Sequence, residues 1–188
     1  MSTPHLLDIG IYQEELKKAL EKARPNDLYQ TIVDAPFKDK VMTARMGLGI
    51  VVLLLVNHDK QTIDRIALAR TDLAQGTLNV TAKPFSEIKI PLGDRDNYIA
   101  IAIRRKHHMA TSDWKYLFVP ALTEQESRLN QAGGGIACSI IYPLDDTGKT
   151  GALIFSYYEP LDRIEKFHHS FMSSYARQAG NMIKKLGG

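Results

Sequence analysis

The stretch IACSIIYPLDDTGKTGALIFSYY, residues 136–158, decides the fold. It holds two runs of apolar and β-branched residues, 136–144 and 151–158, separated by a polar segment with aspartate, threonine and glycine. A short polar segment of this kind between two apolar runs is typical of a turn that joins antiparallel strands. The sequence therefore predicts a β-hairpin near its carboxyl end.

Amphipathic helices are predicted at both ends of the chain. Over residues 161–186 the apolar side chains recur every three or four positions, which is the spacing of one helical face. These residues are Ile164, Phe167, Phe171, Tyr175, Ala179 and Ile183. At the amino end, a helix over about residues 5–24 stops before Pro25, because proline cannot continue a helix interior.

The segments between these helices alternate between helical and extended patterns. A helix is predicted over 36–47, and two β-branched runs joined by NHDKQ, residues 57–61, predict a second hairpin. Further on we expect a loop at 73–84, a strand at 85–92, a helix at 96–106 capped by Asp94 or Asp96, a strand at 107–110, and a helix with a Thr123–Glu126 capping box that ends at glycines 133–135. This order indicates an α+β domain with a mostly antiparallel sheet.

Composition supports one compact domain. The 188 residues are 44% hydrophobic and 24% charged, which is ordinary for a soluble globular protein. The net charge is +3 and the basic residues are spread, so nucleic-acid binding is not indicated. The longest apolar run, 47–56, is about half as long as a membrane-spanning helix, and we predict no membrane association. One cysteine, Cys138, and the absence of a signal-peptide pattern predict a cytoplasmic protein.

The sequence resembles the GAF domain family from about residue 37 onward. In its carboxyl half, a strand ending in Pro-Leu, a charged turn with glycine, a strand opening Gly-Ala-Leu and a helix ending in ARQAGNMI carry the resemblance. Upstream, IKIPLGDRDNYIAIAIRRKHHMATSD, residues 88–113, is similar to the GAF segment in which a strand, a glycine loop, a helix and a short strand lead into an aspartate.

This resemblance implies a single domain over residues 1–188, built as a six-stranded antiparallel sheet flanked by helices on both faces. In such domains the layer formed by the first and last helices often dimerises, and the opposite side often encloses a small ligand. The dimer layer would use Leu16, Leu20, Phe171 and Tyr175. The same apolar stripe could instead bury itself against the sheet.

The specialised chemistries of the family find no match in this chain. GAF-like free methionine sulfoxide reductases use several cysteines, because one thiol attacks and another resolves the product, whereas Cys138 stands alone. Covalent tetrapyrrole attachment would imply a histidine beside the cysteine, and Ser139 follows it instead. The cyclic-nucleotide signature does not match the spacing of NVTAKPFSE, residues 79–87. We therefore predict no catalytic residue and no enzyme activity, and the cofactor stays unknown.

Six histidines raise the question of a metal site. Two pairs are adjacent, His107–His108 and His168–His169. Adjacent residues on a strand or a helix point apart, so neither pair easily supplies two ligands to one ion. No HExxH or paired CxxC pattern occurs. We predict no metal ligand. The alternative that stays open is a metal site formed by one histidine from each pair.

The segment HHMATSDW, residues 107–114, gathers imidazoles, hydroxyls, a carboxylate and the only tryptophan where GAF domains often fold a loop over a ligand. Alternation along a short strand sends His107 and Met109 to one side and His108 and Ala110 to the other. We expect ligand contacts from this segment, the preceding helix and the last two strands. The predicted ligand-binding residues are Tyr98, His108, Asp113, Trp114, Tyr116, Cys138 and Ser156.

These observations predict a cytoplasmic sensory or regulatory domain that binds a small molecule of unknown identity and forms a homodimer. Ligand closure over the sheet would change the packing of the terminal helices, and a downstream signalling protein would read that change. The alternative is a structural dimerisation or interaction module whose pocket is filled by its own side chains. An enzyme of unknown type is a third hypothesis.

Overall fold

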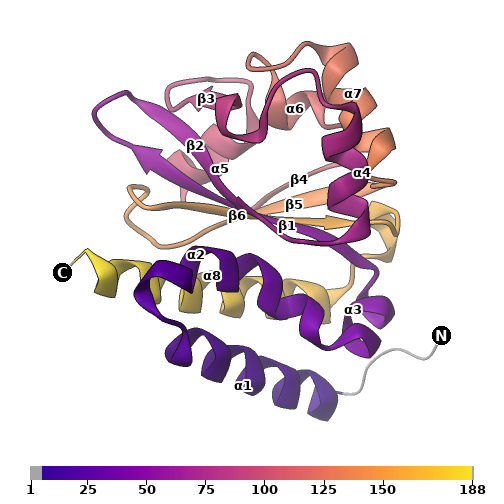
Figure 1. The fold of residues 1–188 in the computed structure, drawn as a ribbon, viewed down its shortest axis with the longest axis vertical. Coiled ribbons are helices and arrows are strands. Elements are labelled where there is room, and N and C mark those ends of the chain that lie inside the picture. Colours follow the sequence, from indigo (N-terminus) through magenta and orange to yellow (C-terminus); the bar gives the residue numbers. More distant parts are fainter. Residues whose placement is uncertain (1–5, 188) are drawn as a thin grey trace.

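The computed structural model describes residues 6–187, which contain a six-stranded antiparallel sheet (Figure 1). The strands are β1 (Leu48–Asn57), β2 (Thr62–Leu68), β3 (Lys89–Pro91), β4 (Met109–Thr111), β5 (Cys138–Pro143) and β6 (Gly151–Tyr157). Their order across the sheet is β3-β2-β1-β6-β5-β4, and every neighbouring pair is antiparallel. The predicted α+β class with six antiparallel strands is confirmed.

Helices cover both faces of the sheet in Figure 1. The terminal layer, as we call it, contains α1 (Leu6–Lys22), α2 (Leu28–Asp34), α3 (Lys40–Met46) and α8 (Lys166–Leu186). The central layer contains α4 (Asp72–Val80), α5 (Tyr98–Arg105), α6 (Lys115–Phe118) and α7 (Glu124–Gly133). Short 3₁₀ turns are η1 (Pro25–Asp27), η2 (Ala35–Lys38), η3 (Phe85–Glu87) and η4 (Leu161–Arg163). None of the helices within residues 6–187 has the length and apolar character that a membrane crossing requires.

Alternation along the strands divides the core in two. In β1, Val51 and Leu53 face the terminal layer, whereas Val52 and Leu54 face the central layer. The neighbouring strand β6 alternates in the same way and is buried along its whole length. Because helices cover both faces, these central strands are continuous apolar runs in the sequence.

The hairpin predicted from residues 136–158 forms as β5 and β6. Cys138 pairs with Tyr157, and Pro143 pairs with Ala152. Gly151, the first residue of β6, has a φ of 152°, and an added Cβ there would clash with the backbone of β1. Glycine is therefore required where β6 first meets the central strand.

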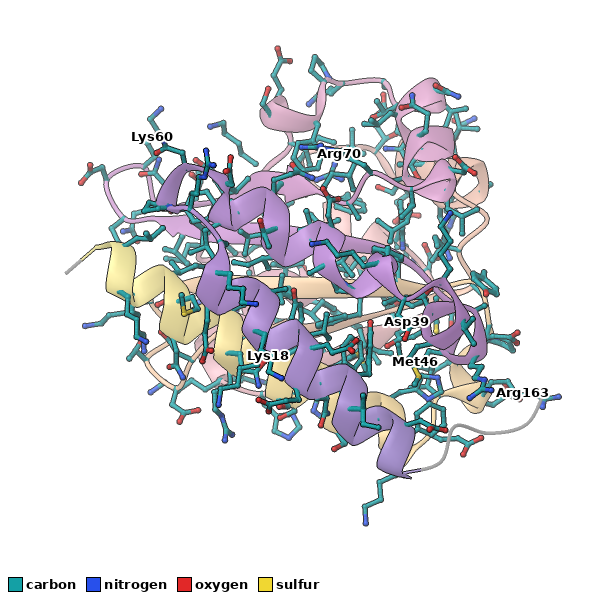
Figure 2. All side chains as sticks on the ribbon, turned by 60° about the horizontal axis from the view of Figure 1, so that its bottom comes forward. Lys18, Asp39, Met46, Lys60, Arg70 and Arg163 are labelled. Carbon is teal, nitrogen blue, oxygen red and sulfur yellow. The ribbon has the colours of Figure 1, made fainter. Side chains whose placement is uncertain are left out.

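The four residues expected at a dimer interface lie inside the terminal layer. Leu16, Leu20, Phe171 and Tyr175 are buried where α1 packs on α8. Figure 2 shows α1 crossing in front of α8, with the exposed Lys18 on its outer side. The apolar stripe is interior to a single chain, which corrects the prediction that these four side chains line a dimer interface.

Two predicted helices are shorter in the structure. The carboxyl-terminal helix begins at Lys166 instead of residue 161, because Glu165 and His168 form a capping box at its start. The helix predicted over 36–47 begins only after Asp39, whose carboxylate accepts a hydrogen bond from the Met42 N–H. The amino-terminal helix agrees with its predicted range, except that residue 5 lies outside the described residues.

The cap of α5 differs from the prediction. Asn97, rather than Asp94 or Asp96, accepts hydrogen bonds from the first free N–H groups of this helix, including that of Ile99. The Asp94 carboxylate instead accepts from the N–H groups of Asp96 and Asn97 in the preceding turn. In contrast, the predicted capping box of Thr123 is confirmed at α7.

Four segments differ from the predicted secondary structure. The expected loop at 73–84 contains α4, because Thr71 caps the helix and Gly76 lets it approach Gly133 of α7 too closely for any Cβ. This packing outweighs the low helix propensity of the segment. The strand expected at 85–92 shrinks to β3 behind η3, and α6 follows directly on Trp114, where the GAF resemblance implies a loop over a ligand. The strand expected at 107–110 begins two residues later, at Met109.

Candidate functional site

Trp114 lies in the core between the sheet and the central layer. Its side chain is 3% exposed and packs edge-on against Phe118. The indole Nε1 donates a hydrogen bond to Ser139 Oγ at 2.8 Å, and this oxygen lies 2.7 Å from Ser156 Oγ. The hydrogen bonds fix Trp114 to β5 and β6. The indole therefore fills the space where the sequence predicts a ligand.

Three other predicted ligand contacts lie at the rim of the central layer. The rings of Tyr98 and Tyr116 stack with their centroids 4.7 Å apart. The Asp113 carboxylate pairs with Arg128 at 2.8 Å and accepts a hydrogen bond from the Lys115 N–H. Desolvation opposes ionisation, but the hydrogen bonds from Arg128 and Lys115 hold the pKa of Asp113 below its ordinary value. The Asp113 carboxylate therefore already has its ion-pair and hydrogen-bond partners within the protein.

His108 and Cys138 lie on the opposite side of the sheet. The His108 ring stacks on Tyr142 and lines a cavity of about 350 Å³ beside α8. The Tyr142 hydroxyl is 2.6 Å from Nδ1 of His169. The Cys138 thiol is buried under the terminal layer and donates a hydrogen bond to the carbonyl oxygen of Glu159. Burial raises the pKa of Cys138 to about 11.

The seven predicted ligand-binding residues therefore lie in three places and do not form one site. Trp114 and Ser156 are joined through Ser139, while Cys138 points to the other face because it is adjacent to Ser139 on β5. Within residues 6–187, no group of three or more histidine, cysteine, aspartate or glutamate side chains is placed to hold a metal ion.

Arg65 on β2 is a residue that sequence reasoning missed. The register of the β1–β2 pair shifts between Leu53 and Leu54, which leaves Ile66 as an extra residue in β2. Arg65 pairs with Leu54 before this bulge and so faces the central layer. Its spacing of two residues from the buried Ile63 is the signal in the sequence, because alternation puts both on one face.

The Arg65 guanidinium is buried between two aromatic rings without a counter-charge. Arg65 is only 7% exposed. Its Cζ atom lies 4.1 Å from the centroid of the Phe85 ring and 5.1 Å from the centroid of the Phe118 ring. Nε has no hydrogen-bond partner, and no carboxylate within residues 6–187 pairs with this arginine. Desolvation lowers the pKa of Arg65 to about 9, so the group is still charged at neutral pH.

A cavity of about 510 Å³, which we call the edge cavity, opens at this side of the sheet. β3 pairs only with residues 62–64 of β2, so within the described chain the rest of that edge has no partner strand. Phe85 forms part of the cavity wall and also contacts Arg65. The remaining wall includes Gln30 of α2 and Gln75 of α4. The edge cavity therefore touches both helical layers.

Hydrogen bonds fasten α2 to the strand end beside the edge cavity. Gln30 Nε2 donates to the carbonyl oxygen of Leu68 at 3.0 Å, and the Arg70 N–H donates to Asp34 at 2.9 Å. Figure 2 shows Arg70 above the ribbon of α2 in that view. Movement of the strand end would therefore be passed to α2 directly.

Comparison with known proteins identifies this architecture. No family model and no curated protein matches the chain. The GAF domain of a phosphoenolpyruvate-protein phosphotransferase from Coxiella burnetii matches with a TM-score of 0.67 at 12% identity, over 97% of this chain and 96% of that one. This chain has the GAF domain fold.

Two further structures with a similar fold come from proteins of different kinds. A methyl-accepting chemotaxis protein domain matches with a TM-score of 0.58 at 11% identity, over 92% of this chain and 96% of that one. The free methionine-R-sulfoxide reductase of Neisseria meningitidis, solved with its substrate, matches with a TM-score of 0.58 at 12% identity, over 98% and 95%. At these identities the likeness shows the GAF fold alone.

Replacement of Arg65 by methionine should stabilise the ligand-free GAF domain. Methionine fills a similar space between the rings and removes an unpaired buried charge, so we expect the free energy of unfolding to rise by about 1–3 kcal/mol in urea titrations. Arg70→Met, at an exposed cation, is the control and should change it by less than about 0.5 kcal/mol. A loss of stability in Arg65→Met would show that the guanidinium supports the fold.

Proposed function

We propose that this chain is a sensory or regulatory GAF domain that binds a small molecule in the edge cavity. The observation that carries the proposal is the cavity itself, which has a volume of about 510 Å³ and walls from both helical layers. Cavities of this volume are typical of sites for small organic ligands. Trp114, a predicted ligand contact, is buried in the core and bonded to Ser139, so we place the ligand at the sheet edge.

The position of the edge cavity suggests how binding would be transmitted. Gln30 belongs to the terminal layer and Gln75 to the central layer. A ligand in contact with both would favour one arrangement of the two layers and shift the population toward it. Since α2 contacts α1, and α1 packs on α8, the change would reach the terminal helices. A downstream signalling protein would recognise the changed arrangement of these helices.

Two of the similar structures support a sensory or regulatory role. One structure with the same fold belongs to a chemotaxis protein and another to a phosphotransferase. A cytoplasmic location is part of the proposal and is supported by the single cysteine, which cannot form an intrachain disulfide.

Reductase chemistry is less well supported by the residues present. The neighbour from Neisseria meningitidis is a reductase, but this chain has one cysteine. Cys138 is buried, and its raised pKa keeps the thiol protonated at neutral pH. A thiol in that state is a poor nucleophile toward a sulfoxide. The proposal therefore contains no catalytic step.

Filling the edge cavity should abolish ligand binding. Gln75→Trp places a large ring in the cavity, whereas Asn79→Trp places the same ring on α4 outside the cavity wall. The variants are matched, because each removes the hydrogen bond between Gln75 and Asn79. A thermal-shift screen of metabolites should find a compound that raises the Tm of wild type and Asn79→Trp but not of Gln75→Trp. The proposal fails if no compound stabilises the wild type, or if Gln75→Trp responds equally.

A second function, homodimerisation, is favoured by exposed apolar side chains on the terminal layer. Ile11 of α1 is 57% exposed and Val41 of α3 is 64% exposed. Both line a groove of about 230 Å³ that also contains Glu15 and Arg45. An apolar patch with charges of both signs can pair with its own copy about a twofold axis. We propose this groove as the dimer interface. A domain whose interior is filled by Trp114 could dimerise through it without binding a ligand.

A charge in this groove should dissociate the dimer. Ile11→Glu adds a carboxylate to a groove already lined by Asp8, Glu15 and Asp39. Burying this further negative charge is costly, so the variant is expected to shift the sedimentation coefficient from dimer to monomer. Leu129→Glu is the control, since this side chain is 52% exposed on α7 of the other layer. Dimerisation through the groove is excluded if wild type sediments as a monomer throughout the concentration range, or if Ile11→Glu sediments as wild type does.

A further inference from the structure

We propose that the ligand of the edge cavity carries an anionic group, a carboxylate or a phosphate, that binds the guanidinium of Arg65. This inference rests on the proposed function and names the chemical class of its ligand. Arg65 is an arginine more than nine-tenths buried, with its Nε unbonded and without a counter-charge within residues 6–187.

The buried charge of Arg65 is not offset by any carboxylate within residues 6–187. A buried charge loses the free energy of its hydration, and only a counter-charge and hydrogen bonds offset this loss. The two phenyl rings offer cation–π contacts, but they accept no hydrogen bond in the guanidinium plane. A carboxylate or phosphate would supply the missing charge, and its oxygens match the planar fork of arginine donors.

Phe85 contacts Arg65 and also lines the edge cavity, whose wall does not include Arg65 itself. Its ring contacts the guanidinium at 4.1 Å and forms part of the cavity wall. It is only partly buried and belongs to η3, a turn of three residues. Phe118, on the other side, is 2% exposed within the central-layer core. Rotation of the Phe85 ring would therefore connect the cavity with the charge, while Phe118 stays in place.

The charged residues in the cavity wall, Arg70 and Asp72, are both exposed and do not need a ligand to offset their charge. Arg70 is an exposed cation and already pairs with Asp34 at 3.5 Å. Asp72 is exposed to solvent at the start of α4, where a carboxylate suits the positive end of the helix. Arg65, next to the wall residue Phe85, is by contrast a buried cation whose Nε lacks a hydrogen-bond partner and which pairs with no carboxylate within the described chain. This missing counter-charge is the reason why we propose an anionic ligand.

Matched pairs of small probes test this inference. Benzoate and benzamide have the same shape and differ in charge, and phenyl phosphate and phenol provide the phosphate arm. Isothermal titration at constant ionic strength should show at least one anion binding the wild type about tenfold or more tightly than its neutral partner. The arm that responds distinguishes a carboxylate from a phosphate. Lys18→Met, which removes an exposed cation on α1 outside the cavity wall, should keep this preference, and Arg65→Met should lose it.

The outcomes separate this inference from the proposed function. If anion and neutral partner bind the wild type alike, or if neither binds, the Arg65 assignment is overturned, whereas a compound from the metabolite screen blocked by Gln75→Trp would still support the cavity. Retention of the anion preference in Arg65→Met also overturns it. Arg65→Gln, which keeps a polar side chain without the charge, replaces Arg65→Met if the latter does not fold, and the same loss is expected.

Discussion

The extra residue at Ile66 in β2 is the constraint on which the site depends. In a regular strand Arg65 and Ala67 would share one face, because side chains alternate. With the bulge, Ala67 pairs with Leu53 and joins the core under the terminal layer, while Arg65 pairs with Leu54 and faces the central layer. One inserted residue therefore places a charge among aromatic rings and still leaves an apolar strand end beneath α2.

The same strand brings the two helical layers together. Because β3 is short, the end of β2 lies open between α2 and α4, and the edge cavity forms there. The interior of the central layer is meanwhile closed by Trp114 and its hydrogen bonds to β5. The domain thus combines a filled core, which stabilises the sheet, with a cavity at the sheet edge. A ligand at that edge would contact elements that are far apart in the sequence.

Local signals in the sequence predict much of the fold. Both hairpins, the terminal helices and the capping box of Thr123 follow from turn residues, periodicity and side-chain caps within a few positions. The site could not be predicted in this way, because it depends on register and packing. Arg65 resembles a solvent-facing charge until Ile63, two residues away, is known to be buried, and Gly76 resembles a helix breaker until α7 lies against it. The sequence predicts a ligand contact for Trp114, because its hydrogen-bond partner Ser139 is 25 residues away and gives no local signal.

The central claim is that Arg65 is a buried, charged and unpartnered group that an anion can reach. Nuclear magnetic resonance of the arginine Nε–Hε groups tests it most directly, with Arg65→Met identifying the signal. The account predicts a signal whose hydrogen exchanges with water more slowly than those of exposed arginines, and which shifts when phenyl phosphate or benzoate is added but not when phenol or benzamide is added. A fast-exchanging signal that neither anion moves would contradict it.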